Sequence, residues 1–185
     1  MRAEGNKKFK KKTQSKNREF IYQEILVNFN TRNHNIIKLY GYFNHKEYVL
    51  LILEYMNNRD LKYFMKKFHA KYPDTNFSEV LTAYFMNQIL KALGYLKIRN
   101  ILHRDIKPEN IMLNSSYISK LGDFSLSRKV DMNNPFKTSR SGTLPYLSPE
   151  CVKKKIEIKP YLCEKLDLFS LGVVMYFLLF NRHPY

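Results

Sequence analysis

The apolar positions in the first third of the chain predict one helix followed by two strands. Residues 18–31 carry four apolar side chains at helical spacing: Phe20, Ile21, Ile25 and Phe29. The run from Glu47 to Glu54 (EYVLLILE) is continuously apolar inside its ends, as in a buried strand. With the aromatic stretch before it, this run predicts an antiparallel pair. Residues 1–17 are polar and basic, and they predict a loop or the irregular start of a helix.

Helical patterns dominate the rest of the chain. Asp60–Phe68 predicts a short helix, and Ser78 is a candidate N-cap with Glu79 in the first turn of a longer one. Its apolar face is formed by Leu81, Tyr84, Phe85, Ile89, Leu93 and Leu96. Residues 101–127 predict short strands and turns, and 128–147 are polar and loop-like. Strands early and helices late indicate an α+β fold with a hinge near 54–58.

The longest apolar run, Leu166–Phe180, predicts a buried core helix. It contains Asp167 and Ser170 and is shorter than the roughly 20 apolar residues that span a membrane. The polar N-terminus shows no signal-peptide pattern. The two cysteines, Cys151 and Cys163, form no CxxC pair, so neither a disulfide framework nor a zinc site is indicated. We therefore expect an intracellular protein, cytoplasmic by default, with the nucleus as an alternative.

The formal net charge of +16 raises the question of a nucleic-acid or anionic-lipid partner. Basic residues cluster only in Lys7–Arg18 and Lys153–Lys155. No aromatic residues alternate with basic ones as in RNA-binding segments. Nucleic-acid binding is therefore a hypothesis that rests on charge alone.

The candidate chemistry lies in Ile101–Leu113 (ILHRDIKPENIML) and Lys120–Ser125 (KLGDFS). Asp105 and Asp123 stand 18 residues apart on separate loops, and Lys107 and Asn110 follow the first of them. Carboxylate and amide oxygens suit Mg²⁺, a carboxylate can take a proton from a hydroxyl, and a lysine can offset phosphoryl charge. The set supplies base, metal ligands and countercharge for phosphoryl transfer.

These motifs resemble those of eukaryotic protein kinases of the serine/threonine type, from about Arg18 to Tyr185. The segments NHNIIKLYGYFNHKEYVLLILEY and SGTLPYLSPE are similar to Aurora-like and calcium-dependent-type kinases. The resemblance implies a two-lobe α+β fold: a basic lead-in at 1–17, a partial N-lobe with the family's αC helix and two or three strands at 18–56, and a partial helical C-lobe at 57–185. Within it, 103–110 would be the catalytic loop, 123–150 the activation segment, and about 166–180 the αF helix, after which the C-lobe would end.

The resemblance also assigns roles in the catalytic loop. Asp105 would orient the substrate hydroxyl, and Lys107 would contact the γ-phosphate of ATP. Asn110 and Asp123 would hold Mg²⁺. His103 would be a packed backbone anchor rather than a metal ligand, and Asp167 would anchor the catalytic loop from within the αF helix.

The nucleotide would be held by residues from both lobes. Glu24 resembles the αC glutamate that pairs with a strand lysine, with a solvated helix carboxylate as its alternative. Leu53 falls at the gatekeeper position. The resemblance places Glu54 and Met56 on the hinge, where backbone groups would bond the adenine. It places Asp60 at the ribose and Met112 as the apolar floor under the base.

The segment before SPE contains the candidate regulatory residues. Thr138 and Ser139 stand where an upstream kinase would add a phosphate, and Arg104 would be its cationic partner. Regulation of this kind is not universal, so an unphosphorylated mode is equally open. Thr143 would lie near Asp105 and Lys107. Glu150 would normally pair with an arginine further along the C-lobe and is expected to be partly unpaired.

Three departures from the family pattern stand out. No glycine-rich loop precedes Glu24, and Gly5 stands alone. Lys7 and Lys8 lie near the right distance for the strand lysine, but their polar surroundings do not predict a strand; the true lysine could precede Met1. The chain stops soon after the αF helix, which would leave apolar surface exposed. Ser125 replaces the DFG glycine, so we expect altered switching with the Asp123 ligand intact.

These observations favour a protein serine/threonine kinase that uses ATP and Mg²⁺ and acts on protein substrates. A truncated or pseudokinase-type scaffold is the alternative, because the glycine loop and strand lysine are missing. The intact Asp105, Lys107, Asn110 and Asp123 favour the enzyme.

Overall fold

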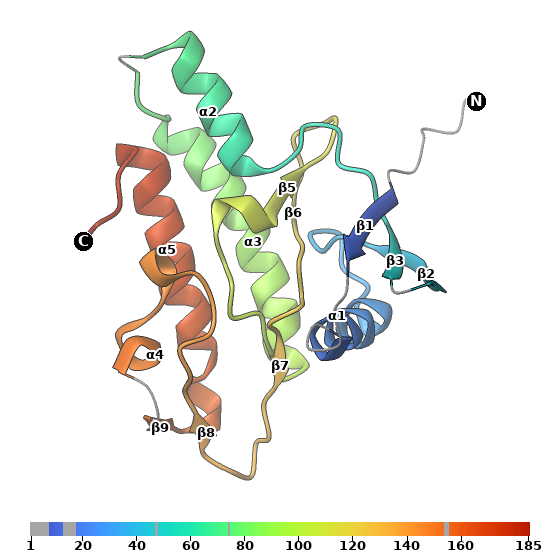
Figure 1. Cartoon of the computed structure of the whole chain (residues 1–185). Helices are drawn as coiled ribbons and strands as arrows, with labels where there is room; N and C mark the ends of the chain where they lie inside the picture. The colour runs from blue at the N-terminus through green and yellow to red at the C-terminus, as the bar shows by residue number, and fades with distance from the viewer. Residues whose placement is uncertain (1–7, 13–17, 47, 74, 154–155) are drawn as a thin grey trace.

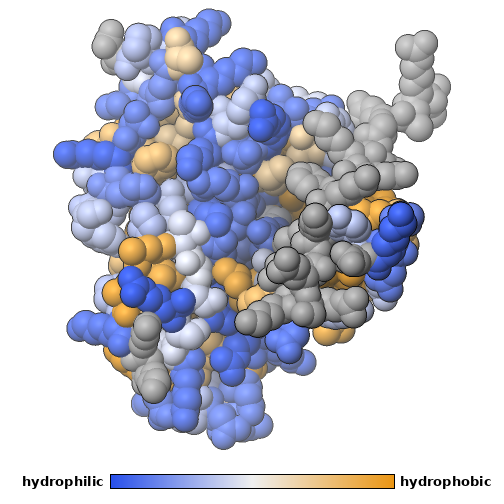
Figure 2. Space-filling view, viewed as in Figure 1, coloured by the Kyte–Doolittle hydropathy of each residue, from blue (hydrophilic) through white to orange (hydrophobic). Residues whose placement is uncertain are grey.

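The computed structural model describes residues 8–12, 18–46, 48–73, 75–153 and 156–185. A small sheet with one helix forms one part of the molecule, and a larger helical part lies beside it (Figure 1). Hydrophilic residues cover most of the face seen in Figure 2, as the basic composition predicts. No helix among the described residues is long and apolar enough to cross a membrane.

The sheet has three antiparallel strands in the order β1-β3-β2. Strand β2 (Leu39–His45) and strand β3 (Tyr48–Leu53) form the predicted pair. The prediction of a loop or helix start is wrong for β1 (Lys8–Lys12), which pairs along β3 from Lys8 opposite Ile52. Backbone hydrogen bonds to the free edge of β3 explain this strand, because such pairing does not require apolar side chains.

Helix α1 (Arg18–Asn30) forms where helical spacing predicts it and packs on the sheet, but through fewer of its apolar residues than the spacing indicates. Ile21 and Ile25 are buried in a cluster with side chains of β2 and β3. Phe20 and Phe29, which were also expected on the apolar face, are 46% and 60% exposed. Helical spacing alone therefore marked a wider apolar face than the small sheet covers.

Three helices build the core of the larger part. Helix α2 (Leu61–Lys71) begins after Asp60 and runs past the predicted end at Phe68. Ser78 caps α3 (Glu79–Ile98) as expected, accepting a hydrogen bond from Leu81 N at 3.1 Å. Helix α5 (Glu164–Phe180) lies along α3, and their contact buries Phe85, Ile89, Val174 and Leu178 completely. The short helix α4 (Pro149–Lys153) overlaps the end of the segment 123–150.

Short strand pairs shape the loops between α3 and α5. Strand β5 (Ile111–Leu113) pairs with β6 (Ser119–Leu121), and β4 (Ile101–Leu102) pairs with β7 (Arg128–Lys129). Strand β8 (Phe136–Lys137) pairs with β9 (Glu157–Ile158). Three-residue 3₁₀ turns complete this region at Pro108–Asn110, Leu144–Tyr146 and Pro160–Leu162.

The segment after α1 is fastened to the helical part by its backbone. Ile37 N donates to Leu121 O at 2.9 Å, and Leu121 N donates to Asn35 O at 2.8 Å. Arg32 N donates to the Tyr95 hydroxyl of α3 at 2.7 Å. These bonds set the position of the sheet and α1 relative to the loops at the carboxyl ends of β4 and β6.

Candidate active site

A buried carboxylate of α5 binds the backbone of the loop after β4. Asp167 accepts His103 N at 2.7 Å and Arg104 N at 2.8 Å, and it is only 4% exposed. Burial raises the pKa of the Asp167 carboxyl because the ion loses its hydration, while the charge of His103 and these N–H groups act in the opposite direction. The two bonds place the backbone before Asp105 in one orientation.

The His103 ring joins this loop to the one that carries Asp123. Its Nε2 atom lies 2.9 Å from Gly122 O, and its ring meets Phe124 edge-on at 4.9 Å between centroids. His103 and Phe124 are both fully buried. This is the placement expected of a packed anchor; the role itself stays a prediction.

Asp105 is surrounded by the residues that the motif sets near it. Asn110 Nδ2 donates to Asp105 O at 2.8 Å and to Asp105 Oδ2 at 3.0 Å. Lys107 Nζ forms an ion pair with Oδ2 at 2.7 Å, and the Thr143 hydroxyl donates to Oδ1 at 2.8 Å. With 7% exposure, the carboxylate is held in a defined position at the surface of the loop.

Thr143 reaches this cluster because of the glycine before it. Gly142 has a φ of +117°, and a Cβ built on it would lie 2.4 Å from Arg104 O. Only glycine allows both the backbone angle and this close approach. Lys107 Nζ donates to the Thr143 hydroxyl at 2.8 Å, so the segment that carries Thr143 is bonded directly to the loop that carries Asp105.

Asp123 lies on the second loop with a left-handed backbone, at φ 59°. Arg104 on the first loop has a φ of 70°. Non-glycine residues in this region are uncommon and gather at functional loops. The structure thus brings Asp105, Lys107 and Asn110 together, and the bond from His103 to Gly122 sets the Asp123 loop beside them.

The oxygen chemistry of this site fits Mg²⁺. Asn110 uses its amide nitrogen to bond Asp105, which leaves its oxygen as the atom able to accept a metal ion. No group of three or more His, Cys, Asp or Glu side chains suited to a metal occurs within the described ranges. Few protein ligands are expected for Mg²⁺, which usually combines one or two carboxylates with phosphate oxygens and water. Asp123 and Asn110 would be its protein ligands.

The residues predicted to hold the nucleotide lie around the junction of the two parts. Leu53 is half-buried at the end of β3, Met56 is 5% exposed, and Met112 is half-buried in β5. Glu54 N donates to Lys38 O at 2.8 Å, so an adenine would have to use the Glu54 carbonyl. Asp60 Oδ1 accepts Tyr63 N at 2.8 Å and caps α2, which gives this carboxylate a structural role beside its predicted ribose contact.

Glu24 is 5% exposed on α1 and takes part in an interaction with another group, so the alternative of a solvated helix carboxylate is wrong. Lys7, a candidate strand lysine, lies outside the described residues. Lys8 stands in β1, so the objection that its surroundings form no strand is also wrong. The strand required for such a lysine is therefore present beside β3.

Sequence reasoning missed an ion pair between the hinge and β6. Lys120 Nζ lies 2.7 Å from Glu54 Oε1, and the two side chains are 10% and 22% exposed. Glu54 Oε2 also accepts Lys38 N at 3.2 Å. Lys120 precedes Asp123 by three residues, so the pair ties the hinge to the strand that leads into the Asp123 loop. No sequence signal marked Lys120, because the partners are far apart along the chain.

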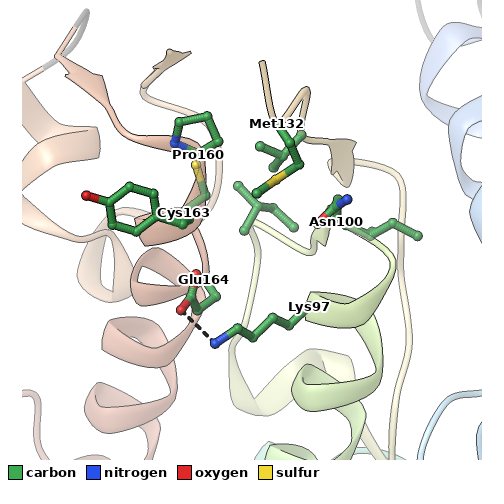
Figure 3. A pocket seen from close by; sticks show the side chains of 10 residues that line it. Lys97, Asn100, Met132, Pro160, Cys163 and Glu164 are labelled. Atoms are coloured by element: carbon green, nitrogen blue, oxygen red, sulfur yellow. Dashed lines mark ion pairs between the residues drawn. The ribbon is translucent and has the colours of Figure 1, made fainter. Parts of the chain in front are cut away.

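A separate cavity of about 190 Å³ lies away from these loops, between the end of α3, β4 and the start of α5. Figure 3 shows Met132, Pro160 and Cys163 around it, with the Lys97–Glu164 ion pair at one side. Burial raises the pKa of the Cys163 thiol to about 11, so it is an unreactive thiol at neutral pH. This cavity contributes nothing to the candidate active site.

Comparison with known proteins decides the family. The Protein kinase domain family matches residues 5–185. The chain belongs to the protein kinase family. Curated Aurora kinases are similar to it: that of Schizosaccharomyces pombe is 38% identical over 93% of this chain, and that of Eremothecium gossypii is 37% identical over 88%. The Aurora kinase of Encephalitozoon cuniculi is 33% identical over 89%.

The resemblance to a kinase catalytic domain is thereby confirmed, and the relatives favour its Aurora-like form. This kinase chain spans 45% and 41% of the length of the first two relatives, and 56% of the third. The predicted α+β two-lobe fold is also confirmed, with three strands and α1 in the smaller lobe.

The Asp167 anchor can be tested by removing its carboxylate. Asp167→Ala leaves two buried N–H groups without acceptors, which should cost about 3 kcal/mol and lower the melting temperature by about 10 °C. Thermal denaturation of the chain checks this. A matched control is Asp131→Ala on the exposed loop, for which we expect a change within about 0.5 kcal/mol. Equal melting temperatures for Asp167→Ala and the parent would contradict the anchor.

The hinge ion pair can be tested by a double-mutant cycle. Lys120→Ala should destabilise the chain by about 2 kcal/mol, because it leaves the partly buried Glu54 carboxylate without its partner. Urea denaturation of Lys120→Ala, Glu54→Ala and the double variant should give a coupling of about 1 kcal/mol or more. Strict additivity of the two single changes would show that the pair contributes no net interaction.

Proposed function

We propose that this chain transfers the γ-phosphoryl group of ATP to serine or threonine hydroxyls of protein substrates. The observation that carries the proposal is the set of bonds on the Asp105 carboxylate, from Asn110, Lys107 and Thr143. One oxygen accepts the amide and the ammonium, and the other accepts a hydroxyl. Such a fixed carboxylate beside a lysine is suited to align an acceptor hydroxyl and receive its proton.

Each residue around Asp105 would contribute to a different part of the transfer. Asn110 holds the Asp105 carboxylate in one rotamer. Less conformational entropy of this side chain is then lost when a substrate binds. Lys107 is 20% exposed and would offset charge on the transferred phosphoryl. The Thr143 hydroxyl would give up its bond to Oδ1 when an acceptor hydroxyl takes its place. When bound by Asp123 and Asn110, Mg²⁺ would supply countercharge on the ATP phosphates.

Two observations support serine and threonine as acceptors. The lysine at position 107 is typical of serine/threonine kinases in the family resemblance, and it contacts both Asp105 and Thr143 here. The similar curated proteins are named Aurora kinases. The scaffold alternative loses one of its supports, because a strand that contains Lys8 does stand beside β3.

We place this activity inside the cell, in the cytoplasm by default. Cys151 and Cys163 are both free thiols, which fits a reducing compartment. Nucleic-acid binding has no support beyond the charge of the chain.

The proposed role of Asp105 has a direct test. Asp105→Asn keeps the size of the side chain but removes the proton acceptor, so transfer from ATP to a serine or threonine peptide should fall by about 10²–10⁴-fold. Binding of Mg²⁺·ADP should change little, because Asp105 is not a proposed metal ligand. Asp131→Asn is the matched control and should keep the parent rate. Full activity in Asp105→Asn would overturn the proposal.

We further propose that Ser139, rather than Thr138, receives a regulatory phosphate from an upstream kinase. Thr138 is 4% exposed, and its hydroxyl donates to Glu150 O at 3.0 Å and accepts Ile156 N at 3.0 Å. The Ser139 hydroxyl is half-buried and accepts a hydrogen bond from Arg104 Nη2. Glu150 itself is exposed on α4.

The charges around Arg104 favour an anion at Ser139. Burial lowers the pKa of Arg104, and the positive charge of Arg128 lowers it further. Both arginines line a cavity of about 210 Å³ together with Ser125 and residues of α1. A phosphate on Ser139 would offset the repulsion between the two guanidinium groups and order the activation segment against the catalytic loop.

Mass spectrometry after incubation with an activation-segment kinase and ATP tests this choice. We expect phosphate on Ser139, its loss in Ser139→Ala, and its retention in Thr138→Ala. Thr138→Ala should instead lower stability by about 1–2 kcal/mol, because it removes two buried hydrogen bonds. Phosphate found on Thr138 in the parent chain would contradict the assignment.

A further inference from the structure

Glu54, directly after β3, is held through both its backbone and its side chain. Its N–H donates to Lys38 O at 2.8 Å, and its Oε2 atom accepts Lys38 N at 3.2 Å. Its Oε1 atom lies 2.7 Å from Lys120 Nζ of β6. Glu54 is therefore bonded to two segments of the chain, the one before β2 and the strand that leads into the Asp123 loop.

Lys120 reaches Glu54 from the strand pair that carries the predicted floor of the nucleotide site. In the antiparallel register Lys120 stands opposite Met112, and Met112 also forms an antiparallel bridge with Asp60. Residues directly opposite each other in such pairs place their side chains on the same face. Lys120 therefore shares a face with the residues predicted to lie under the base and at the ribose.

The surroundings of the ion pair make it a firm connection. The side chains of Lys120 and Glu54 are 10% and 22% exposed, so water screens their attraction less than at an open surface. A hydrogen bond between an ammonium and a carboxylate is also stronger than one between neutral groups. Rotation of Glu54 would have to break this bond in a partly buried place, which restricts the residue to one orientation.

The orientation of Glu54 matters for the atom that an adenine would bind. The Glu54 N–H is used by Lys38, so the predicted hinge presents the Glu54 carbonyl to the exocyclic amino group of adenine. Hydrogen bonds weaken steeply when donor and acceptor are misaligned. A carbonyl held in one direction therefore distinguishes a base with this amino group better than a carbonyl that can turn.

We propose that Lys120 is a positioning residue for the nucleotide base. Through its ion pair it holds the Glu54 carbonyl toward the exocyclic amino group of adenine and so favours adenine over purines that lack this group. This role rests on the proposed function, because it takes the hinge to be the place where the base of ATP binds. It adds a determinant of base recognition on β6, outside the hinge itself.

Nucleotide binding measures this role without relying on turnover. Calorimetric titrations with Mg²⁺·ADP and with the Mg²⁺ complex of purine riboside diphosphate isolate the contact, because the two nucleotides differ only in the exocyclic amino group. The parent chain should bind ADP about tenfold more tightly, as expected for one well-placed hydrogen bond. Lys120→Met keeps an unbranched side chain but removes the ammonium, and should lower this ratio to about twofold by weakening the binding of ADP.

Glu54→Gln tests whether the effect passes through the ion pair. It removes the charge of the carboxylate, keeps its size, and should also lower the ratio. Lys120→Met should then have a smaller effect in the Glu54→Gln background than in the parent, because the two changes affect one interaction. Thermal melting identifies a variant that fails to fold, and Glu54→Gln alone carries the test if Lys120→Met does so.

Lys97→Met is the matched control. It breaks the Lys97–Glu164 ion pair of 3.0 Å, which lies beside the cavity away from the candidate active site. Both nucleotides should bind Lys97→Met as they bind the parent chain, so the ratio should not change.

The opposing results have distinct meanings. An unchanged ratio in Lys120→Met, or an equal loss of affinity for both nucleotides, overturns the role of Lys120 in base recognition. An equal fall in Lys97→Met shows general loosening and overturns it as well, as does an undiminished effect of Lys120→Met in the Glu54→Gln background. A parent chain that binds both nucleotides equally overturns this inference and leaves the proposed transfer in place. Failure to bind either nucleotide overturns the proposed function itself, and this inference with it.

Discussion

The bond from the Asp167 carboxylate to two backbone N–H groups is the constraint on which the candidate site depends. It fastens the loop after β4 to helix α5 of the larger part. A buried carboxylate is costly unless its hydrogen bonds are complete, so it tolerates little displacement of its partners. From this anchor, His103 reaches Gly122, and the Asp123 loop takes its position from the same point.

A second set of contacts brings the segment around Thr143 to the loop that carries Asp105. Thr143 bonds Asp105 and Lys107, and Gly142 lies against the carbonyl of Arg104. The segment that carries Thr143 and the proposed phosphate site at Ser139 therefore both contact one residue, Arg104, the first at its carbonyl and the second at its guanidinium. Order in the segment around Thr143 and the alignment of Asp105 are coupled physically, because neither contact can form without the other segment in place.

The smaller lobe is joined to the site by backbone bonds and an ion pair, in addition to Val27 and Ile36, which are part of the apolar core of the larger part. Ile37 and Asn35 pair with Leu121, and Lys120 pairs with Glu54. Both connections end on β6, three residues or fewer before Asp123. Movement of the hinge or of the segment after α1 would therefore shift the loop that carries Asp123. Ser125 adds a local restraint of its own on the Asp123 carboxylate.

The sequence by itself determined the elements and chemistry that depend on neighbours along the chain. Helix caps, the β2–β3 pair, the buried α5 and the joint pattern of Asp105, Lys107, Asn110 and Asp123 all follow from local spacing. Tertiary structure alone decided contacts between distant residues. It made a strand of Lys8–Lys12, because β3 offered an unpaired edge. It exposed Phe20 and Phe29, because the sheet is too small to cover them. It also separated Thr138 from Ser139 by burying one hydroxyl and turning the other toward Arg104, since adjacent residues of an extended chain face opposite sides.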